Sequence, residues 1–264
     1  MNDQGGGRDL VPVSTGSLAA LLPTASELAP LRMPEPNLVL GKSLMRGVHL
    51  VASELGQVGK DGLAGCLLAA AESVDLPVAI VEVSDRAGPC AKSYAGIAAQ
   101  HIFPDEDTIG GRVAEFLREH DRHTVVINVG SSAFLTVCAA EAVINRFAAG
   151  SGRPFRLLWV CGPHETNSTV PLNYRQSGGA AQCTVCVRRP DPRWARRMPS
   201  PEAFSTLGTK GKVIGIPVLP ELMEERFFRG HRRIRDAYDQ APVAERLEFD
   251  ARFIAFLNDL AEAF

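Results

Sequence analysis

A chain of 264 residues in which 45% of the side chains are hydrophobic can bury the core of one large α/β domain or of two small ones. The formal net charge of −2 argues against a polyanion binder that works through bulk charge. Six cysteines without a secretory signal predict free thiols in a reducing cytoplasm, and no segment is expected to span a membrane.

Residues 1–40 are predicted to form a flexible N-terminal arm. They contain Gly5-Gly6-Gly7, several prolines and only a weak apolar periodicity, so the segment has little with which to form a packed core. The expected organisation is therefore this arm followed by a single domain over residues 44–264.

From Val48 onward, short β-branched runs alternate with amphipathic stretches. The expected strands are 48–52, 77–83, 124–129, 155–161, 182–187 and 212–217. The expected helices are 60–74, 108–121, 133–149, 167–178, 221–240 and 243–263. Strands that are apolar throughout are buried on both faces, and their alternation with helices makes the sheet largely parallel. The sequence predicts a three-layer α/β/α fold with a mostly parallel central sheet, whose ligands lie beyond the C-terminal strand ends.

The segment after the first strand has the layout of a phosphate-binding loop, in which a glycine-containing turn carries a lysine and leads into a helix of small residues. Backbone N–H groups at such a helix start surround phosphate oxygens, and the lysine adds a positive charge. The candidate nucleotide-binding residues are Gly56, Gln57, Val58, Gly59, Lys60, Asp61 and Gly62. Asp61 stands where a hydroxyl would hold Mg²⁺, and its carboxylate repels a triphosphate unless a metal lies between them. We therefore expect ATP or ADP to bind weakly, and Mg²⁺ to bind weakly or not at all.

Two further strand ends bear on whether the protein can hydrolyse ATP. In an ATPase of this architecture, acidic groups at these ends hold the metal and orient the attacking water. The second strand carries Glu82 just before its last residue and is soon followed by Asp85, whereas the third carries Asn128, an amide that offers Mg²⁺ no negative charge. Together with Asp61, these positions predict weak or absent ATP hydrolysis. An active ATPase in which Asp61, Glu82 or Asp85 serves the metal stays open as an alternative.

Four segments resemble the ParA/MinD-type P-loop ATPases and, among them, the TraL-like proteins of bacterial conjugative transfer regions. These segments are residues 48–60, 77–85, 125–134 and 213–225. The resemblance implies a P-loop NTPase-like fold, a homodimer, and partner proteins from a plasmid conjugal transfer or partition system. The family's signature lysine, which reaches the partner's nucleotide across the dimer, falls on Leu55 and is absent. The function that follows is binding or scaffolding with a degenerate nucleotide site.

Two other patterns suggest different ligands. Cys161-x-x-His164 and Cys183-x-x-Cys186 can be written together as a zinc pattern, but alternation within a strand would point Cys183 and Cys186 to opposite faces, so buried thiols are the preferred interpretation. Arginines cluster around Trp194 and again over residues 226–235. Solvated helix faces usually explain such runs, and contact with DNA through them is a secondary hypothesis.

Three smaller predictions complete the sequence analysis. The last helix carries five acidic and two basic side chains over residues 243–264, so its apolar stripe is expected to dock on the core and not on anionic lipid. His49 is expected to be a core histidine. Ser131 and Ser132 are expected to cap the helix that follows them.

Overall fold

The computed structural model describes residues 33–34, 42, 45–53, 56, 58–104, 108–161, 182–188 and 213–264, with residues 182–188 and 213 described by their backbone alone. All of these residues belong to one compact unit, Met33–Phe264. The predicted helix over residues 167–178 lies outside the described residues, as does nearly all of the predicted arm. Both therefore stay predictions.

The centre of the molecule is a seven-stranded sheet in the order β3-β2-β4-β1-β5-β6-β7, in which every neighbouring pair is parallel. The strands are β1 (Val48–Ala52), β2 (Val78–Val83), β3 (Ala99–Ile102), β4 (Thr124–Val129), β5 (Phe155–Cys161), β6 (Gln182–Arg188) and β7 (Val213–Ile216). β1, β2, β4 and β5 are buried along their whole length, as their unbroken apolar runs require. The chain order reverses around β4 and β1, and such a point opens a crevice at the carboxyl edge of a parallel sheet.

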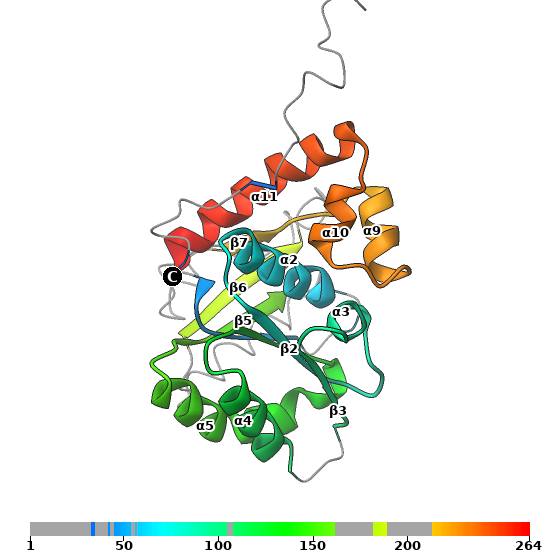
Figure 1. Ribbon diagram of the computed structural model, residues 1–264. Coiled ribbons are helices and arrows are strands. Elements are labelled where there is room, and N and C mark those ends of the chain that lie inside the picture. The colour runs from blue at the N-terminus through cyan, green and yellow to red at the C-terminus, as the bar shows by residue number, and fades with distance from the viewer. Residues whose placement is uncertain are drawn as a thin grey trace, which may run out of the picture. The chain divides into compact units, whose positions relative to one another are not determined.

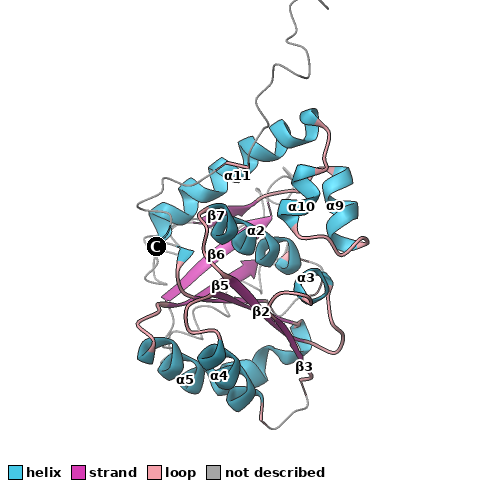
Figure 2. Ribbon diagram, in the orientation of Figure 1, coloured by secondary structure: helices cyan, strands magenta, loops and turns pink. Residues whose placement is uncertain are grey.

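Helices cover both faces of this sheet, as Figure 1 shows by element and Figure 2 by type of structure. α2 (Lys60–Ser73), α9 (Glu221–Phe228), α10 (Ile234–Asp239) and α11 (Val243–Ala263) pack on one face, and α4 (Ile109–Glu119) and α5 (Phe134–Gly150) pack on the other. The short α3 (Pro89–Tyr94) packs beside β2 and α2, and a 3-10 turn, η2 (Ser131–Ala133), precedes α5. The predicted three-layer α/β/α fold with a parallel sheet is therefore confirmed.

Successive strand residues divide between two hydrophobic cores, because side chains alternate across a pleated sheet. Val48 and Leu50 of β1 join the core beneath α4 and α5, whereas Val51 joins the core beneath α2 and α11. The apolar stripe of α11 is fully covered, with Phe249, Phe253 and Leu260 each 0% exposed. The prediction that the last helix docks on the core is confirmed.

α2 is buried almost from end to end, which its small side chains make possible. It lies between the sheet and the helices α3 and α10. A methyl group added at Gly65 would lie 2.7 Å from Ile234 Cδ1 and 2.8 Å from Phe227 Cζ. Glycine at this position therefore allows α9 and α10 to approach the helix that begins at the phosphate-binding loop.

η2 and α5 together form a helical stretch that is long and apolar enough to cross a membrane. The stretch Ser131–Gly150 has a mean hydropathy of 1.3, and 33% of its apolar window is buried. In this fold Phe134, Val137 and Ile144 pack into the core against the sheet. A single helix of this kind is weak support for a membrane span, so the expectation that no segment spans a membrane stays a prediction.

The structure differs from the predicted elements in two ways. Sequence patterning did not predict α3 or β3, which are short elements of six and four residues. The predicted helix over residues 221–240 is instead two helices, α9 and α10. The chain breaks between them at Gly230, where a methyl group would lie 2.8 Å from the Arg226 carbonyl oxygen, and at His231, whose φ is 50°.

Candidate functional site

A cleft of about 510 Å³ opens where β2 and β4 end and α2 begins. Its walls come from the start of α2, from the residues that follow β2 and β4, and from α9. This is the carboxyl edge of the sheet, where the sequence placed the ligand. The cleft is the candidate nucleotide site, and its chemistry follows from a small number of charged and polar groups.

The start of α2 has a glycine cap, as a phosphate-binding loop does. Gly59 caps the helix in the left-handed conformation, with φ 102° and ψ 16°, which favours glycine over any other residue. Lys60 follows it and lines the cleft while being only 8% exposed. Burial lowers the pKa of Lys60, and the charge of Asp61 opposes that change.

The structure divides the candidate nucleotide-binding residues. Gly56, Gly59, Lys60 and Asp61 line the cleft. Val58 is 4% exposed and belongs to the hydrophobic core, and Gly62 is buried within α2, so neither is among the lining residues. Gln57 lies outside the described residues. Nucleotide binding by these positions stays a prediction.

Asp61 and Asn128 form a direct link across the cleft. The Asn128 amide donates a 2.6 Å hydrogen bond from Nδ2 to Oδ1 of Asp61 and so joins the first turn of α2 to β4. Asn128 is 3% exposed, and its Oδ1 atom has no hydrogen-bond partner within the described part of the chain. A buried carbonyl oxygen without a donor or a metal is costly, so this atom marks a place where a ligand would be stabilising.

Glu82 is the second carboxylate of the cleft. It occupies the β2 position that pairs with Asn128 of β4, so the two side chains emerge side by side from the same face of the sheet. The backbone N–H of Ala91 donates to Glu82 Oε2 over 3.2 Å, and a methyl group at Gly88 would overlap Oε1. Burial and then the charge of Asp61 raise the pKa of Glu82 to about 7. The two carboxylates therefore act on each other electrostatically at the base of the cleft.

Asp85 and the serines after β4 have other roles than those predicted. Ser132 Oγ donates to Asp85 Oδ2 over 3.0 Å, and Asp85 is exposed and does not line the cleft. Neither η2 nor α5 has a side-chain cap, since Gly130 and Ala133 are their N-cap residues. The prediction that Ser131 and Ser132 cap the helix was wrong. Ser131 lines the cleft instead.

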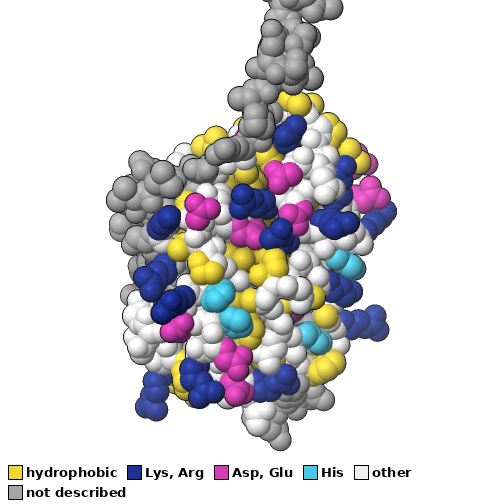
Figure 3. Space-filling view, in the orientation of Figure 1, with side chains coloured by type: hydrophobic (Ala, Val, Ile, Leu, Met, Phe, Trp, Pro, Cys, Tyr) yellow, Lys and Arg dark blue, Asp and Glu magenta, His cyan; other side chains and the backbone are white. Residues whose placement is uncertain are grey.

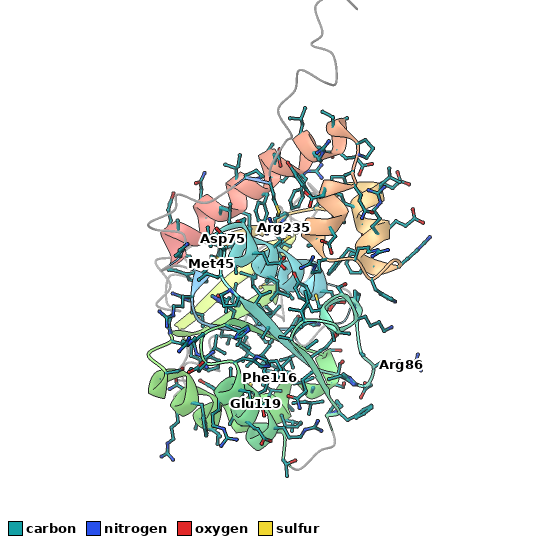
Figure 4. The ribbon with its side chains drawn as sticks, in the orientation of Figure 1. Met45, Asp75, Arg86, Phe116, Glu119 and Arg235 are labelled. Carbon is teal, nitrogen blue, oxygen red and sulfur yellow. The ribbon has the colours of Figure 1, made fainter. Side chains whose placement is uncertain are left out.

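Sequence analysis missed the contribution of α9, which brings Glu224 and Phe228 to the cleft. No local motif marks these residues, because they reach the site only through the packing of α9 against α3 and α2. Arg86 stands at the rim, where Figure 4 shows its side chain at the edge of the molecule. The described lining residues thus include two basic side chains, Lys60 and Arg86, and three acidic side chains, Asp61, Glu82 and Glu224.

The residues of the cleft fit a phosphate group only in part. The helix start, Gly59 and Lys60 retain the groups that attract phosphate oxygens. The hydroxyl ligand of a nucleotide-bound Mg²⁺ is replaced by the Asp61 carboxylate, which already accepts a hydrogen bond from Asn128. Weak or absent ATP hydrolysis stays a prediction.

The remaining candidate sites lie elsewhere. Cys161 is a buried thiol of the core, while His164 and the side chains of Cys183 and Cys186 are outside the described residues. The described part of the chain holds no group of three or more His, Cys, Asp or Glu side chains suited to a metal. The zinc hypothesis as a whole stays untested.

The described arginine cluster is engaged in the fold. Arg233 pairs with Glu72 and Asp236, Arg235 donates to the Glu72 carbonyl, and Arg229 pairs with Glu225. Lys and Arg side chains are interspersed with Asp and Glu side chains on the face seen in Figure 3. These contacts favour a structural role for the cluster. The arginines around Trp194 lie outside the described residues.

The sequence matches no protein-family model and no curated protein. Among solved structures, the fold is similar to a chain of the MinC:MinD cell division protein complex of Aquifex aeolicus, with a TM-score of 0.51 and 12% sequence identity. The similarity covers 81% of this chain and 95% of the other. The protein therefore has a ParA/MinD-like P-loop fold, and at this identity the likeness concerns the fold alone.

Proposed function

We propose that the protein is a cytoplasmic, TraL-like binding or scaffolding component of a plasmid conjugal transfer or partition system, with weak nucleotide binding and little or no ATP hydrolysis. The segment resemblances and the ParA/MinD-like fold support this assignment. The similar MinD chain is found in a complex with MinC, which supports protein partners for the present chain. A homodimer is part of the same proposal.

The observation that carries the proposal is the hydrogen bond between Asp61 and Asn128. In P-loop NTPases, Mg²⁺ and the γ-phosphate connect the loop to the strand-end and switch residues, and hydrolysis breaks that connection. Here a 2.6 Å side-chain bond connects α2 to β4 without either group. Protein side chains alone thus join the two walls of the cleft, and a partner surface built on these walls would not depend on nucleotide turnover.

A second candidate, an active ATPase of the same family, is favoured by the presence of both Asp61 and Glu82 in the cleft. These two carboxylates could serve the metal. Asp85 cannot be included with them, because its carboxylate accepts a hydrogen bond from Ser132 away from the cleft lining. The two candidates differ in turnover and in the effect of replacing Asp61.

The first experiment is calorimetric titration of the full-length protein with ATP and ADP, with and without Mg²⁺, followed by a hydrolysis assay. We expect weak binding that does not require Mg²⁺ and that is lost in Lys60→Ala. The matched control is Arg118→Ala, which removes a positive charge from an exposed ion pair on α4. Mg²⁺-dependent hydrolysis that disappears in Lys60→Ala but persists in Arg118→Ala would refute the proposal.

The second experiment is Asp61→Ser, measured with a chelator present so that no divalent cation bridges the groups. If Asp61 only repels the phosphates, its removal strengthens ATP binding by about tenfold or more, which corresponds to about 1.4 kcal/mol of lost repulsion. If Asp61 serves a catalytic metal, the same variant gains no ATP affinity when Mg²⁺ is present. Measurements with chelator and with Mg²⁺ therefore distinguish the scaffold from the active ATPase.

A further inference from the structure

β3 is the outermost of the described strands on one side of the sheet, so only one of its two edges is paired (Figure 1). In its parallel ladder with β2, the Ile80 N–H donates to the Ala98 carbonyl oxygen over 2.9 Å. Successive residues of a strand turn their backbone groups to opposite edges. The N–H and C=O groups of Ala99 and His101 therefore face away from β2, and within the described residues they have no hydrogen-bond partner.

A groove of about 380 Å³ lies between this strand and α4. Its helix side is one flank of α4, because the lining residues recur at the spacing of a single helix face. They include Arg112, Glu115, Phe116 and Glu119. Figure 4 labels Phe116 and Glu119 on this flank. The groove shares no lining residue with the cleft, so it is a separate feature of the surface.

Exposed apolar side chains stand at both ends of β3. Ile97, two residues before the strand, is 56% exposed, and Phe103, directly after it, is 50% exposed. Natural proteins often protect an unpaired strand edge with lysine or proline, because such an edge is a template on which another chain can pair. β3 is short, but it contains neither residue. Its edge therefore offers backbone groups, apolar contacts and a neighbouring groove together.

We propose that the free edge of β3 binds an extended, basic peptide segment of a partner protein, which joins the sheet as a further strand. In this mode of recognition the backbone hydrogen bonds supply affinity, and alternate side chains of the peptide supply specificity. Side chains on the α4 face of the added strand meet Glu115 and Glu119. Side chains on the other face meet Phe103, whose ring contacts that of His101 at 4.7 Å between centroids.

The charges of the groove favour a basic partner over a second copy of this chain. Burial lowers the pKa of His120, so near pH 8 its ring is neutral, and the described lining carries two carboxylates against the one guanidinium of Arg112. The pair between Glu115 and Arg118 is 3.5 Å long and highly exposed, so it holds Glu115 only weakly. Two copies paired through β3 would bring this flank of α4 against its own copy, where the carboxylates repel each other. Lysine or arginine side chains are attracted instead.

The test is fluorescence anisotropy of a capped, labelled peptide of about nine residues in which lysine and valine alternate, titrated with the full-length protein. We expect saturable binding of one peptide per chain with a Kd below about 1 mM. Within a strand, the N–H groups of the lysines and those of the valines point to opposite edges. N-methylation of all lysines or of all valines therefore blocks one edge only, and only one of these two peptides should lose affinity, by about tenfold or more.

Variants of the protein locate the peptide. Ala99→Pro removes an outward N–H group without breaking the ladder to β2, so it should weaken binding by about fivefold. Glu115→Gln combined with Glu119→Gln should weaken binding by about fivefold and reduce its dependence on salt. Glu221→Gln is the matched control, since Glu221 is exposed on α9, which packs on the opposite face of the sheet.

Equal binding of the unmodified peptide and both N-methylated peptides would overturn the inference, as would the absence of saturable binding at about 1 mM protein. Full binding by Ala99→Pro and by the double glutamine variant would place the peptide elsewhere and overturn it too. The N-methylated peptides are compared on wild-type protein, so misfolding of a variant cannot account for their result. Binding at β3 goes beyond the proposed function, because it requires neither a nucleotide nor the cleft, and its failure would leave the nucleotide experiments unaffected.

Discussion

Replacing Arg233 by alanine should expose how strongly the α2 layer depends on one buried ion pair. Arg233 Nη1 lies 3.1 Å from Glu72 Oε1 at the end of α2, and the Tyr94 hydroxyl donates to Glu72 Oε2 over 3.0 Å. The side chain of Glu72 is 9% exposed and that of Arg233 is 29% exposed. The pair therefore ties α10 to α2 in a partly buried place.

The expected loss in free energy of unfolding is about 2–3 kcal/mol near pH 8. Leaving a fully buried charge unpaired costs about 3–5 kcal/mol, and the partial exposure of Arg233 reduces this figure. Arg235 lies near enough to Glu72 to offset part of the charge. The control is Arg229→Ala, whose pair with Glu225 is highly exposed and should contribute no more than about 0.5 kcal/mol.

The loss should also depend on pH. Burial raises the pKa of Glu72, and the charge of Arg233 opposes that rise, so removing Arg233 raises the pKa further. A carboxyl whose pKa is raised by folding contributes stability that is complete below its unfolded pKa and is lost as the pH rises through its folded value. The loss in free energy of unfolding caused by Arg233→Ala should therefore be smaller at pH 5 than at pH 8.

Urea denaturation of wild type, Arg233→Ala and Arg229→Ala at both pH values measures these differences. Repeating Arg233→Ala in a Glu72→Gln background isolates the ion pair from the contact between Arg233 and Asp236, and there the loss should fall by about 1 kcal/mol or more. Equal losses in Arg233→Ala and Arg229→Ala, or a loss that grows as the pH is lowered, would refute the reasoning.

Three further predictions concern glycines of the segment that begins at the cleft, and all three are measured by urea denaturation. Gly59→Ala should destabilise the protein by about 1–2 kcal/mol, because a φ of 102° at this position strains any side chain. Gly62→Ala should be neutral or stabilising by up to about 1 kcal/mol, because a methyl group at this position meets nothing within 4 Å. Gly65→Ala should destabilise by about 1–2 kcal/mol through overlap with Ile234 and Phe227, in spite of the better helix propensity of alanine. A Gly65→Ala protein as stable as Gly62→Ala would contradict the packing described for α2.

The sheet was predictable because its central strands carry a signal that does not depend on tertiary structure. Strands buried on both faces must be apolar throughout, and β1, β4 and β5 have the bounds that the sequence predicted. β3 lacks that signal, since Gln100 and His101 are half-buried residues in a four-residue edge strand. The split between α9 and α10 was hidden because the apolar positions continue across Gly230 at helical spacing.

The site was predictable only where a local motif defines it. Gly59, Lys60 and Asp61 belong to one loop, so spacing identified them together. The bond between Asp61 and Asn128 joins residues 67 positions apart, and its existence follows from strand order and register, which the sequence does not display. Glu224 reaches the cleft only through helix packing, so no sequence motif could have identified it.

Loop geometry and loop chemistry have separate physical origins in this protein. The shape of the phosphate-binding turn is maintained by the burial of α2 along its length and by the left-handed conformation of Gly59, neither of which involves a ligand. The charges around that turn come from Lys60, Asp61 and Glu82, whereas the Asn128 amide is neutral. The conformation of Gly59 and the burial of α2 are therefore no argument for ATP hydrolysis.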